Sequence, residues 1–238
     1  MSKRITNFPL PDVMGNEFET SVNLDFRVKQ PDPDLEGEFV ESQFWGIPTT
    51  DSPVSITKSL PQELNTGSDF TTNGFKFYDG IRGKHQGFER IEVATPEVID
   101  PQELTAYMRA GEIMVDQAVI NYINSYNQGN EYDLRIAGAR IQNRVKDGFG
   151  NSWGCHDNFG YLPPHVESIV DPENIPLITY YLASRSLISG SGAITPSRYL
   201  LSQKAESIES VNSYGFYGRM FRTTRDAAET TARIEISS

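Results

Sequence analysis

The sequence predicts an α+β fold, because segments with the two-residue alternation of strands occur together with two segments that carry helix start and stop signals. The chain has 238 residues, of which 37% are hydrophobic, so it is long enough for one large packed domain or two small ones. We expect a single domain covering 1–238. No apolar run is long enough to span a membrane, and residues 1–15 lack the apolar core of a secretory signal. The single cysteine, Cys155, excludes an internal disulfide. Together these features predict a cytoplasmic protein.

Strand-like alternation begins near the amino end and recurs along the chain. The segments with this pattern are 12–27, 73–79, 89–97, 132–145, 152–162, 218–226 and 232–237. A turn-rich stretch joins 132–145 to 152–162, which predicts that these two strands form a hairpin. A long loop excursion is predicted within 20–72, after the first strand, because residues 30–72 are rich in Pro, Asp, Ser, Thr and Gly.

Two helices are predicted between the strands. The first begins after Asp100, because Pro101 suits the first helical position and Glu103 stands three residues after the cap. Its pattern ends near Gly129. The second helix covers NIPLITYYLASRSLIS, with Asn174 as its cap.

The charge balance restricts the classes of partner. The formal net charge is -11, and the Lys and Arg residues are spread thinly rather than clustered. Because binding of nucleic acid needs clustered cations to neutralise phosphates, this composition argues against a nucleic-acid partner. Acidic side chains that converge in one cleft would instead bind a divalent cation and, through it, a nucleotide.

Three glutamates lie in strand-like segments at positions suited to metal binding. Glu17 and Glu19 are two residues apart, so both carboxylates should leave one face of the strand while Phe18 points to the other. Glu92 stands between two apolar residues in the same alternating way. The alternative for each of them is an ordinary exposed polar face of a strand.

Four other polar residues are candidates for chemistry. Asp79 closes a strand and could act as a base towards an incoming amine, or could simply form the turn that follows. His156 and Asn158 share one face of their strand, where an imidazole suits either a metal or a structural hydrogen bond. Arg225 belongs to a series of arginines suited to bidentate phosphate contacts, or to surface solvation.

Six segments of the chain, taken in order, carry a family resemblance. They are MGNEFET, NGFKFYD, ERIEVATPE, GNSWGCHDNF, YLLSQKAESI and RTTRD. In this order they resemble the motifs of the Pup ligase and Pup deamidase/depupylase family, whose members are related to glutamine synthetase. The resemblance spans 12–238 and corresponds to the amino-terminal half of that family. Six matches in one order are hard to obtain by chance.

The resemblance implies a glutamine synthetase-like α+β fold, with a curved, mainly antiparallel sheet and helices packed on one face. It implies ATP and Mg²⁺ as cofactors. The implied activity is an ATP-dependent ligase that activates a side-chain carboxylate of a small Pup-like protein modifier as an acyl phosphate, for attack by a lysine amine of a protein substrate. The alternatives are the deamidase/depupylase branch, which hydrolyses the corresponding amide or isopeptide bond, and a non-catalytic binding module on the same fold.

The resemblance also implies roles for individual residues. It assigns the metal ligands to Glu17, Glu19, Glu92 and His156. It makes Asp79 the catalytic aspartate, and Arg225 and Asn158 the contacts to nucleotide or phosphate.

Two features depart from the family pattern. Arg90 and Ile91 stand where the family has His-Pro, and the inserted GIRGKHQGF lengthens the interval between Asp79 and Glu92. The family also continues past the segment that corresponds to residues 232–237. We therefore expect the natural polypeptide to extend beyond Ser238.

Overall fold

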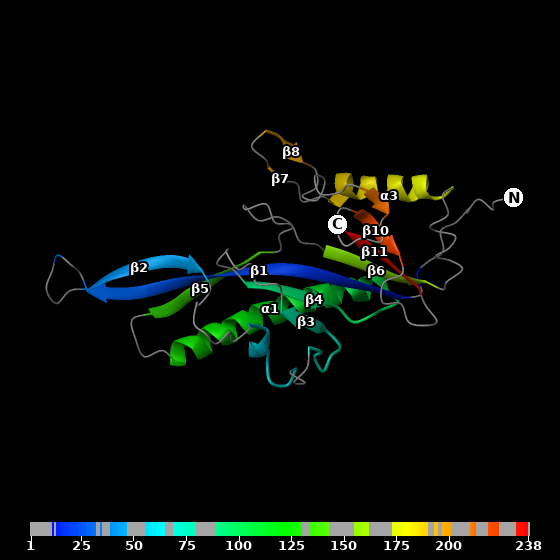
Figure 1. Cartoon of the computed structure of the whole chain (residues 1–238). Helices are drawn as coiled ribbons and strands as arrows, with labels where there is room; N and C mark the ends of the chain where they lie inside the picture. Colours follow the sequence, from blue (N-terminus) through cyan, green and yellow to red (C-terminus); the bar gives the residue numbers. More distant parts are fainter. Residues whose placement is uncertain are drawn as a thin grey trace. The chain divides into compact units, whose positions relative to one another are not determined.

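A computed structural model describes residues 11, 13–31, 34, 39–46, 56–64, 69–79, 89–129, 134–142, 155–161, 173–189, 193–194, 197–200, 210–212, 219–223 and 232–237. The strands and helices are shown in Figure 1. In chain order they are β1 (Val13–Pro31), β2 (Phe39–Gly46), η1 (Ile56–Ser59), β3 (Lys76–Asp79), β4 (Glu89–Ala94), α1 (Pro101–Gly129), β5 (Leu134–Gln142), β6 (Cys155–Tyr161), α3 (Ile175–Ser189), β7 (Ala193–Ile194), β8 (Tyr199–Leu200), β9 (Ser210–Asn212), β10 (Arg219–Thr223) and β11 (Ala232–Ser237).

The chain divides into two compact units that share strand β1. Unit 1 consists of Met1–Glu17, Glu97–Thr105 and Val145–Ser238, and unit 2 of Phe18–Pro96 and Ala106–Arg144. The expectation of a single domain over 1–238 stays a prediction. No helix among the described residues is long and apolar enough to cross a membrane.

Strand β1 organises the sheet of unit 2. It pairs antiparallel with β2, from Leu24 opposite Gly46, and with β5, from Ser21 opposite Gln142. It is also the neighbour of β4, which pairs antiparallel with β3. In the β1–β5 ladder the register skips Ala137, which is a β-bulge.

The core of unit 2 lies between this sheet and α1. The buried apolar side chains of the unit are Phe18, Val22, Leu24, Phe26, Ile56, Phe75, Phe77, Ile91, Val93, Met114, Val115, Ala118, Val119, Tyr122 and Ile136. Those of β1 are spaced by multiples of two residues, so they share one face of the strand. Tyr126 of α1 meets the ring of Phe26 edge-on with centroids 6.0 Å apart, and burial raises the pKa of Tyr126.

Helix α1 packs closely against two aromatic rings at Gly111. A Cβ atom built there would lie 3.0 Å from Cζ of Phe18 and 3.2 Å from Cε1 of Phe75. Glycine usually weakens a helix interior, so its presence here is explained by the two aromatic rings that occupy the space of a side chain.

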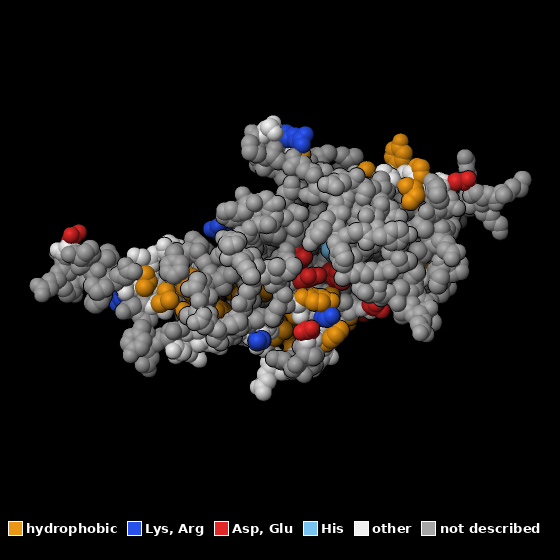
Figure 2. All heavy atoms as spheres, viewed as in Figure 1, with side chains coloured by type: hydrophobic (Ala, Val, Ile, Leu, Met, Phe, Trp, Pro, Cys, Tyr) orange, Lys and Arg blue, Asp and Glu red, His pale blue; other side chains and the backbone are white. Residues whose placement is uncertain are grey.

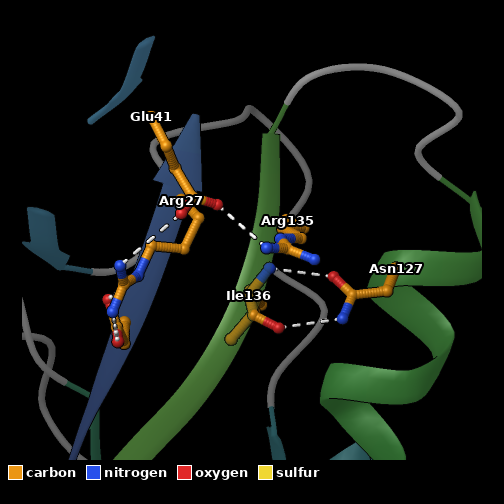
Figure 3. A network of polar contacts seen from close by, with 6 residues as sticks. Arg27, Glu41, Asn127, Arg135 and Ile136 are labelled. Atoms are coloured by element: carbon orange, nitrogen blue, oxygen red, sulfur yellow. Dashed lines mark hydrogen bonds and ion pairs between the residues drawn. The ribbon is translucent and has the colours of Figure 1, made fainter. Parts of the chain in front are cut away.

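The last turn of α1 is joined to β5 by one side chain. The Nδ2 atom of Asn127 donates to the carbonyl of Ile136 at 2.9 Å, and Oδ1 of Asn127 accepts from the Ile136 amide at 2.8 Å (Figure 3). Nearby on the sheet surface, Oε1 of Glu41 accepts a hydrogen bond of 2.9 Å from Nη2 of Arg135. Its other oxygen, Oε2, lies 3.8 Å from Nη1 of Arg27. These exposed ion pairs add little stability, whereas the Asn127 contacts satisfy backbone groups of a buried residue.

Unit 1 contains the sheet formed by β6, β11, β10 and β9, with the first residues of β1 beside β6. β6 and β11 are antiparallel, as are β11 and β10, while β10 and β9 are parallel. Val13 lies so close to Gly160 that a Cβ at Gly160 would be 2.6 Å from Cγ2 of Val13. The backbones of Met14 and Val98 exchange two hydrogen bonds of 2.7 and 2.9 Å.

Helix α3 also belongs to unit 1. Its first turn is closed by a hydrogen bond of 3.0 Å from the Leu177 amide to the Asn174 carbonyl. Leu177, Tyr180 and Tyr181 are exposed, and apolar side chains are visible at the surface over α3 in Figure 2.

The structure confirms most of the predicted elements. Helix α1 begins at Pro101, where Oδ1 of Asp100 accepts from the Gln102 amide at 2.7 Å, which is the predicted cap. The strands predicted in 73–79, 89–97, 218–226 and 232–237 are present as β3, β4, β10 and β11.

Two predictions about the strands differ from the structure. The predicted loop excursion at 20–72 contains the second half of β1, which extends to Pro31, and strand β2. The predicted hairpin between 132–145 and 152–162 is wrong, because β5 pairs with β1 and β6 pairs with β11. Both differences arise from long-range pairing, which local composition does not encode.

Replacement of Gly111 by Leu should destabilise the protein. The new side chain would overlap the rings of Phe18 and Phe75 in a filled core, so we expect the free energy of unfolding to fall by about 2 kcal/mol. Urea denaturation followed by circular dichroism measures this change. Ala106→Leu, at an exposed position of the same helix, is the control and should have little effect. Equal losses for the two variants would contradict the packing described at Gly111.

Loss of the Asn127 side chain should loosen β5. In Asn127→Ala the amide and carbonyl of Ile136 lose their partners, which should lower the free energy of unfolding by about 1–2 kcal/mol. Hydrogen exchange should accelerate at the Ile136 amide in particular. The control is Gln128→Ala, at the adjacent exposed position of α1. Unchanged exchange at Ile136 in Asn127→Ala would show that the two hydrogen bonds are not maintained in solution.

Candidate functional site

A carboxylate and an imidazole face each other across β1 and β6 in unit 1. Nδ1 of His156 lies 3.6 Å from Oε2 of Glu17, and the two side chains are 24% and 18% exposed. The contact is an ion pair only when the imidazole is protonated. Two of the residues predicted as metal ligands are therefore neighbours, although they come from distant parts of the sequence.

The residues next to this pair meet as a second, separate cluster. Asn16 is 1% exposed, and its Nδ2 atom donates to Oδ1 of Asp157 at 2.9 Å and to Sγ of Cys155 at 3.3 Å. The thiol of Cys155 lies 3.6 Å from Oδ1 of Asn16. Since neighbouring residues of a strand point to opposite faces, this cluster and the Glu17–His156 pair lie on opposite faces of the two strands.

Asn158 and Glu19 are partly buried on these strands. Nδ2 of Asn158 donates to the backbone carbonyl of His156 at 3.4 Å. Phe18 is buried against α1, so alternation along β1 assigns Glu17 and Glu19 to the opposite face of the strand, as the sequence predicts.

In unit 2, Glu92 is partly buried and stands between the buried residues Ile91 and Val93, which confirms the predicted alternation. Its partner in the β3–β4 ladder is Tyr78, so these two side chains share a face of the strand pair. Asp79 pairs with Ile91 in the backbone register, one position further along. The side chain of Asp79, and the whole of Arg225, lie outside the described residues.

Lys76 is a cation near Glu92 that the sequence analysis did not single out. Its Nζ atom lies 4.3 Å from the ring centroid of Tyr78 and 5.3 Å from that of Phe70, within the range of cation–π attraction. Lys76 and Tyr78 are two residues apart, so the cation lies on the same face of the strand pair as Glu92. The alternation within KFYD is the signal that could have identified this pair.

The side chains at Glu17 and His156 fit a divalent cation of a particular kind. Mg²⁺ is usually bound by one or two carboxylates together with waters and substrate phosphates, rather than by an all-protein cage. Within the described part of the chain, no group of three or more His, Cys, Asp and Glu residues could hold a metal ion. The Glu17 carboxylate is the type of ligand that Mg²⁺ prefers, and the adjacent imidazole can bind a coordinated water or a phosphate.

Known proteins similar to this chain are Pup ligases. The Pup–protein ligase of Corynebacterium diphtheriae is 29% identical over 176 residues, which cover 71% of this chain and 33% of that protein. That of Acidimicrobium ferrooxidans is 32% identical and covers 68% of this chain and 34% of that protein. That of Pseudarthrobacter chlorophenolicus is 33% identical, with coverage of 69% and 34%. The chain thus spans about a third of the length of these curated relatives.

A solved structure with a similar fold is that of the complex between the prokaryotic ubiquitin-like protein Pup and its ligase PafA. The superposition has a TM-score of 0.59 at 19% sequence identity, and covers 96% of this chain and 41% of that chain. This likeness supports the predicted fold class, a glutamine synthetase-like α+β fold with a mainly antiparallel sheet. The family model described as Pup-ligase protein matches residues 9–233. Because this match covers nearly the whole sequence, the chain belongs to the Pup-ligase protein family.

Proposed function

We propose that this chain carries the nucleotide- and metal-binding site of an ATP-dependent ligase that joins Pup to lysine side chains of proteins. The observation that carries the proposal is the Glu17–His156 pair, which lies within the segment matched by the family. The names of the curated relatives, all Pup–protein ligase, favour the ligase over the depupylase branch.

Glu17, Glu19, Glu92 and His156 are proposed to contribute to the binding of Mg²⁺. Among the described residues no three of them form a metal cage, so each would act together with waters and the phosphates of ATP. Glu17, Glu19 and Glu92 are partly buried carboxylates on strands, which limits their rotamers and orders them before the ion binds. When bound, Mg²⁺ neutralises charge on the phosphates of ATP, and phosphoryl transfer depends on such neutralisation. Lys76, held against two aromatic rings, is a further cation that could face a phosphate.

The proposed reaction has two steps. A side-chain carboxylate of Pup attacks the terminal phosphorus of ATP, which gives an acyl phosphate and ADP. A lysine amine then attacks the acyl carbon, phosphate leaves, and an isopeptide bond is formed. Asp79 is proposed to accept the proton from the amine. Arg225 and Asn158 are proposed to contact the nucleotide.

Removal of a carboxylate ligand should weaken binding of Mg-ATP. We expect Glu17→Gln and Glu92→Gln each to weaken it by tenfold or more, because loss even of an outer partner of a metal ligand typically costs about 10–100-fold in metal affinity. Isothermal titration calorimetry with Mg-ATP measures the change. Glu103→Gln, at an exposed position in the first turn of α1, is the control and should bind as the unaltered protein does. Equal affinities for all three variants would exclude a metal site at these glutamates.

The activity itself can be tested with the chain, ATP, Mg²⁺, a Pup-like modifier that ends in Glu and a protein with accessible lysines. The ligase proposal predicts a conjugate band on denaturing gels that requires ATP and is lost in Glu17→Gln. Loss of a preformed conjugate, with none newly made, would instead identify an isopeptide hydrolase. Tight Mg-ATP binding with neither reaction and no phosphate release would identify a non-catalytic binding module.

A further inference from the structure

Strands β1 and β6 contact each other through side chains on both faces. On one face, Oε2 of Glu17 lies 3.6 Å from Nδ1 of His156. On the other face, Nδ2 of Asn16 donates to Oδ1 of Asp157 at 2.9 Å. The two contacts join consecutive residues of one strand to consecutive residues of the other, so the position of one contact determines the position of the other.

These contacts follow the order expected of one antiparallel register. Val13 lies against Gly160, Asn16 against Asp157 and Glu17 against His156, so residue numbers rise along β1 as they fall along β6. A slip of one residue would exchange the faces of all side chains on one strand. Glu17 would then no longer lie beside His156.

The hydrogen bond between Asn16 and Asp157 is suited to prevent such a slip. Asn16 is 1% exposed, so in any other register its amide would need a new partner within the interior. A buried amide without a partner costs free energy, and a hydrogen bond to a charged carboxylate is stronger than one between neutral groups. In coiled coils, a single buried asparagine is known to fix the register of the helices.

We propose that Asn16 and Asp157 are positioning residues, whose hydrogen bond holds Glu17 and His156 in the arrangement that binds Mg-ATP. The inference rests on the proposed function of the Glu17–His156 pair. Asn16 and Asp157 act through the backbone from the face opposite to the site and do not themselves contact metal or nucleotide.

Two substitutions of Asp157 separate positioning from charge. Asp157→Asn and Asp157→Ala both remove one negative charge, but only the asparagine keeps an oxygen that can accept from Asn16. We expect Asp157→Ala to bind Mg-ATP about tenfold more weakly than Asp157→Asn, because only the asparagine keeps the hydrogen bond that holds Glu17 beside His156. Calorimetric titration with Mg-ATP measures the affinities, and thermal unfolding measured in parallel shows that each variant is folded.

A reciprocal exchange tests the Asn16 side of the pair. Asn16→Asp places two carboxylates together and should weaken Mg-ATP binding, whereas a simple charge effect predicts tighter binding of the cation. The double variant Asn16→Asp/Asp157→Asn restores one donor and one acceptor with the original net charge. It should recover most of the affinity that Asn16→Asp loses. If Asn16→Asp does not fold, the comparison of the two Asp157 variants still decides the question.

The outcomes distinguish this inference from the function on which it rests. If Glu17→Gln does not change the affinity for Mg-ATP, the proposed metal site is wrong. If Glu17→Gln weakens binding but Asp157→Ala and Asp157→Asn bind equally, the positioning role is wrong and the metal site stands. A lower melting temperature for Asp157→Ala with unchanged affinity would show a structural role only.

Discussion

The structure depends above all on the strict alternation of side chains along one long strand. β1 has 19 residues and contributes to both compact units. Because successive residues of a strand point to opposite faces, each side chain of β1 is assigned to one face as soon as any of them is fixed. Phe18 fixes this assignment, since its ring packs against Gly111 of α1. The faces of Asn16, Glu17 and Glu19 then follow from the burial of one aromatic ring.

The sequence predicts best the features that are decided locally. The start of α1 is predicted correctly because the cap at Asp100 needs only the residues that follow it. Strand β2 is not predicted, because its segment has a loop-like composition and gains its order from pairing with the second half of β1. The partner of β5 is likewise decided by a strand more than a hundred residues earlier, opposite Ser21 to Val28. Long-range pairing of this kind leaves no signal within the strand itself.

The same distinction applies to the candidate site. The faces of Glu17 and Glu92 could be predicted, because alternation within a strand is local and the flanking apolar residues are buried as expected. The contact between Glu17 and His156 could be reached only through a family resemblance, since the two residues meet through the pairing of distant strands. The contact of Asn16 with Asp157 was not predicted at all. Asn16 lies in MGNEFET and Asp157 in GNSWGCHDNF, but the resemblance assigns a role to neither residue, and their hydrogen bond follows from register alone.

The link between Asn127 and β5 has a consequence for association between protein molecules. A strand with unsatisfied amides and carbonyls along one side is a template on which a strand of another chain can add, and such edges are sites of aggregation. At Ile136 both backbone groups are already bound by the side-chain amide of Asn127, which presents a donor and an acceptor much as a neighbouring strand would. At this position a helix therefore takes the place of the next strand, and growth of the sheet by another molecule is opposed.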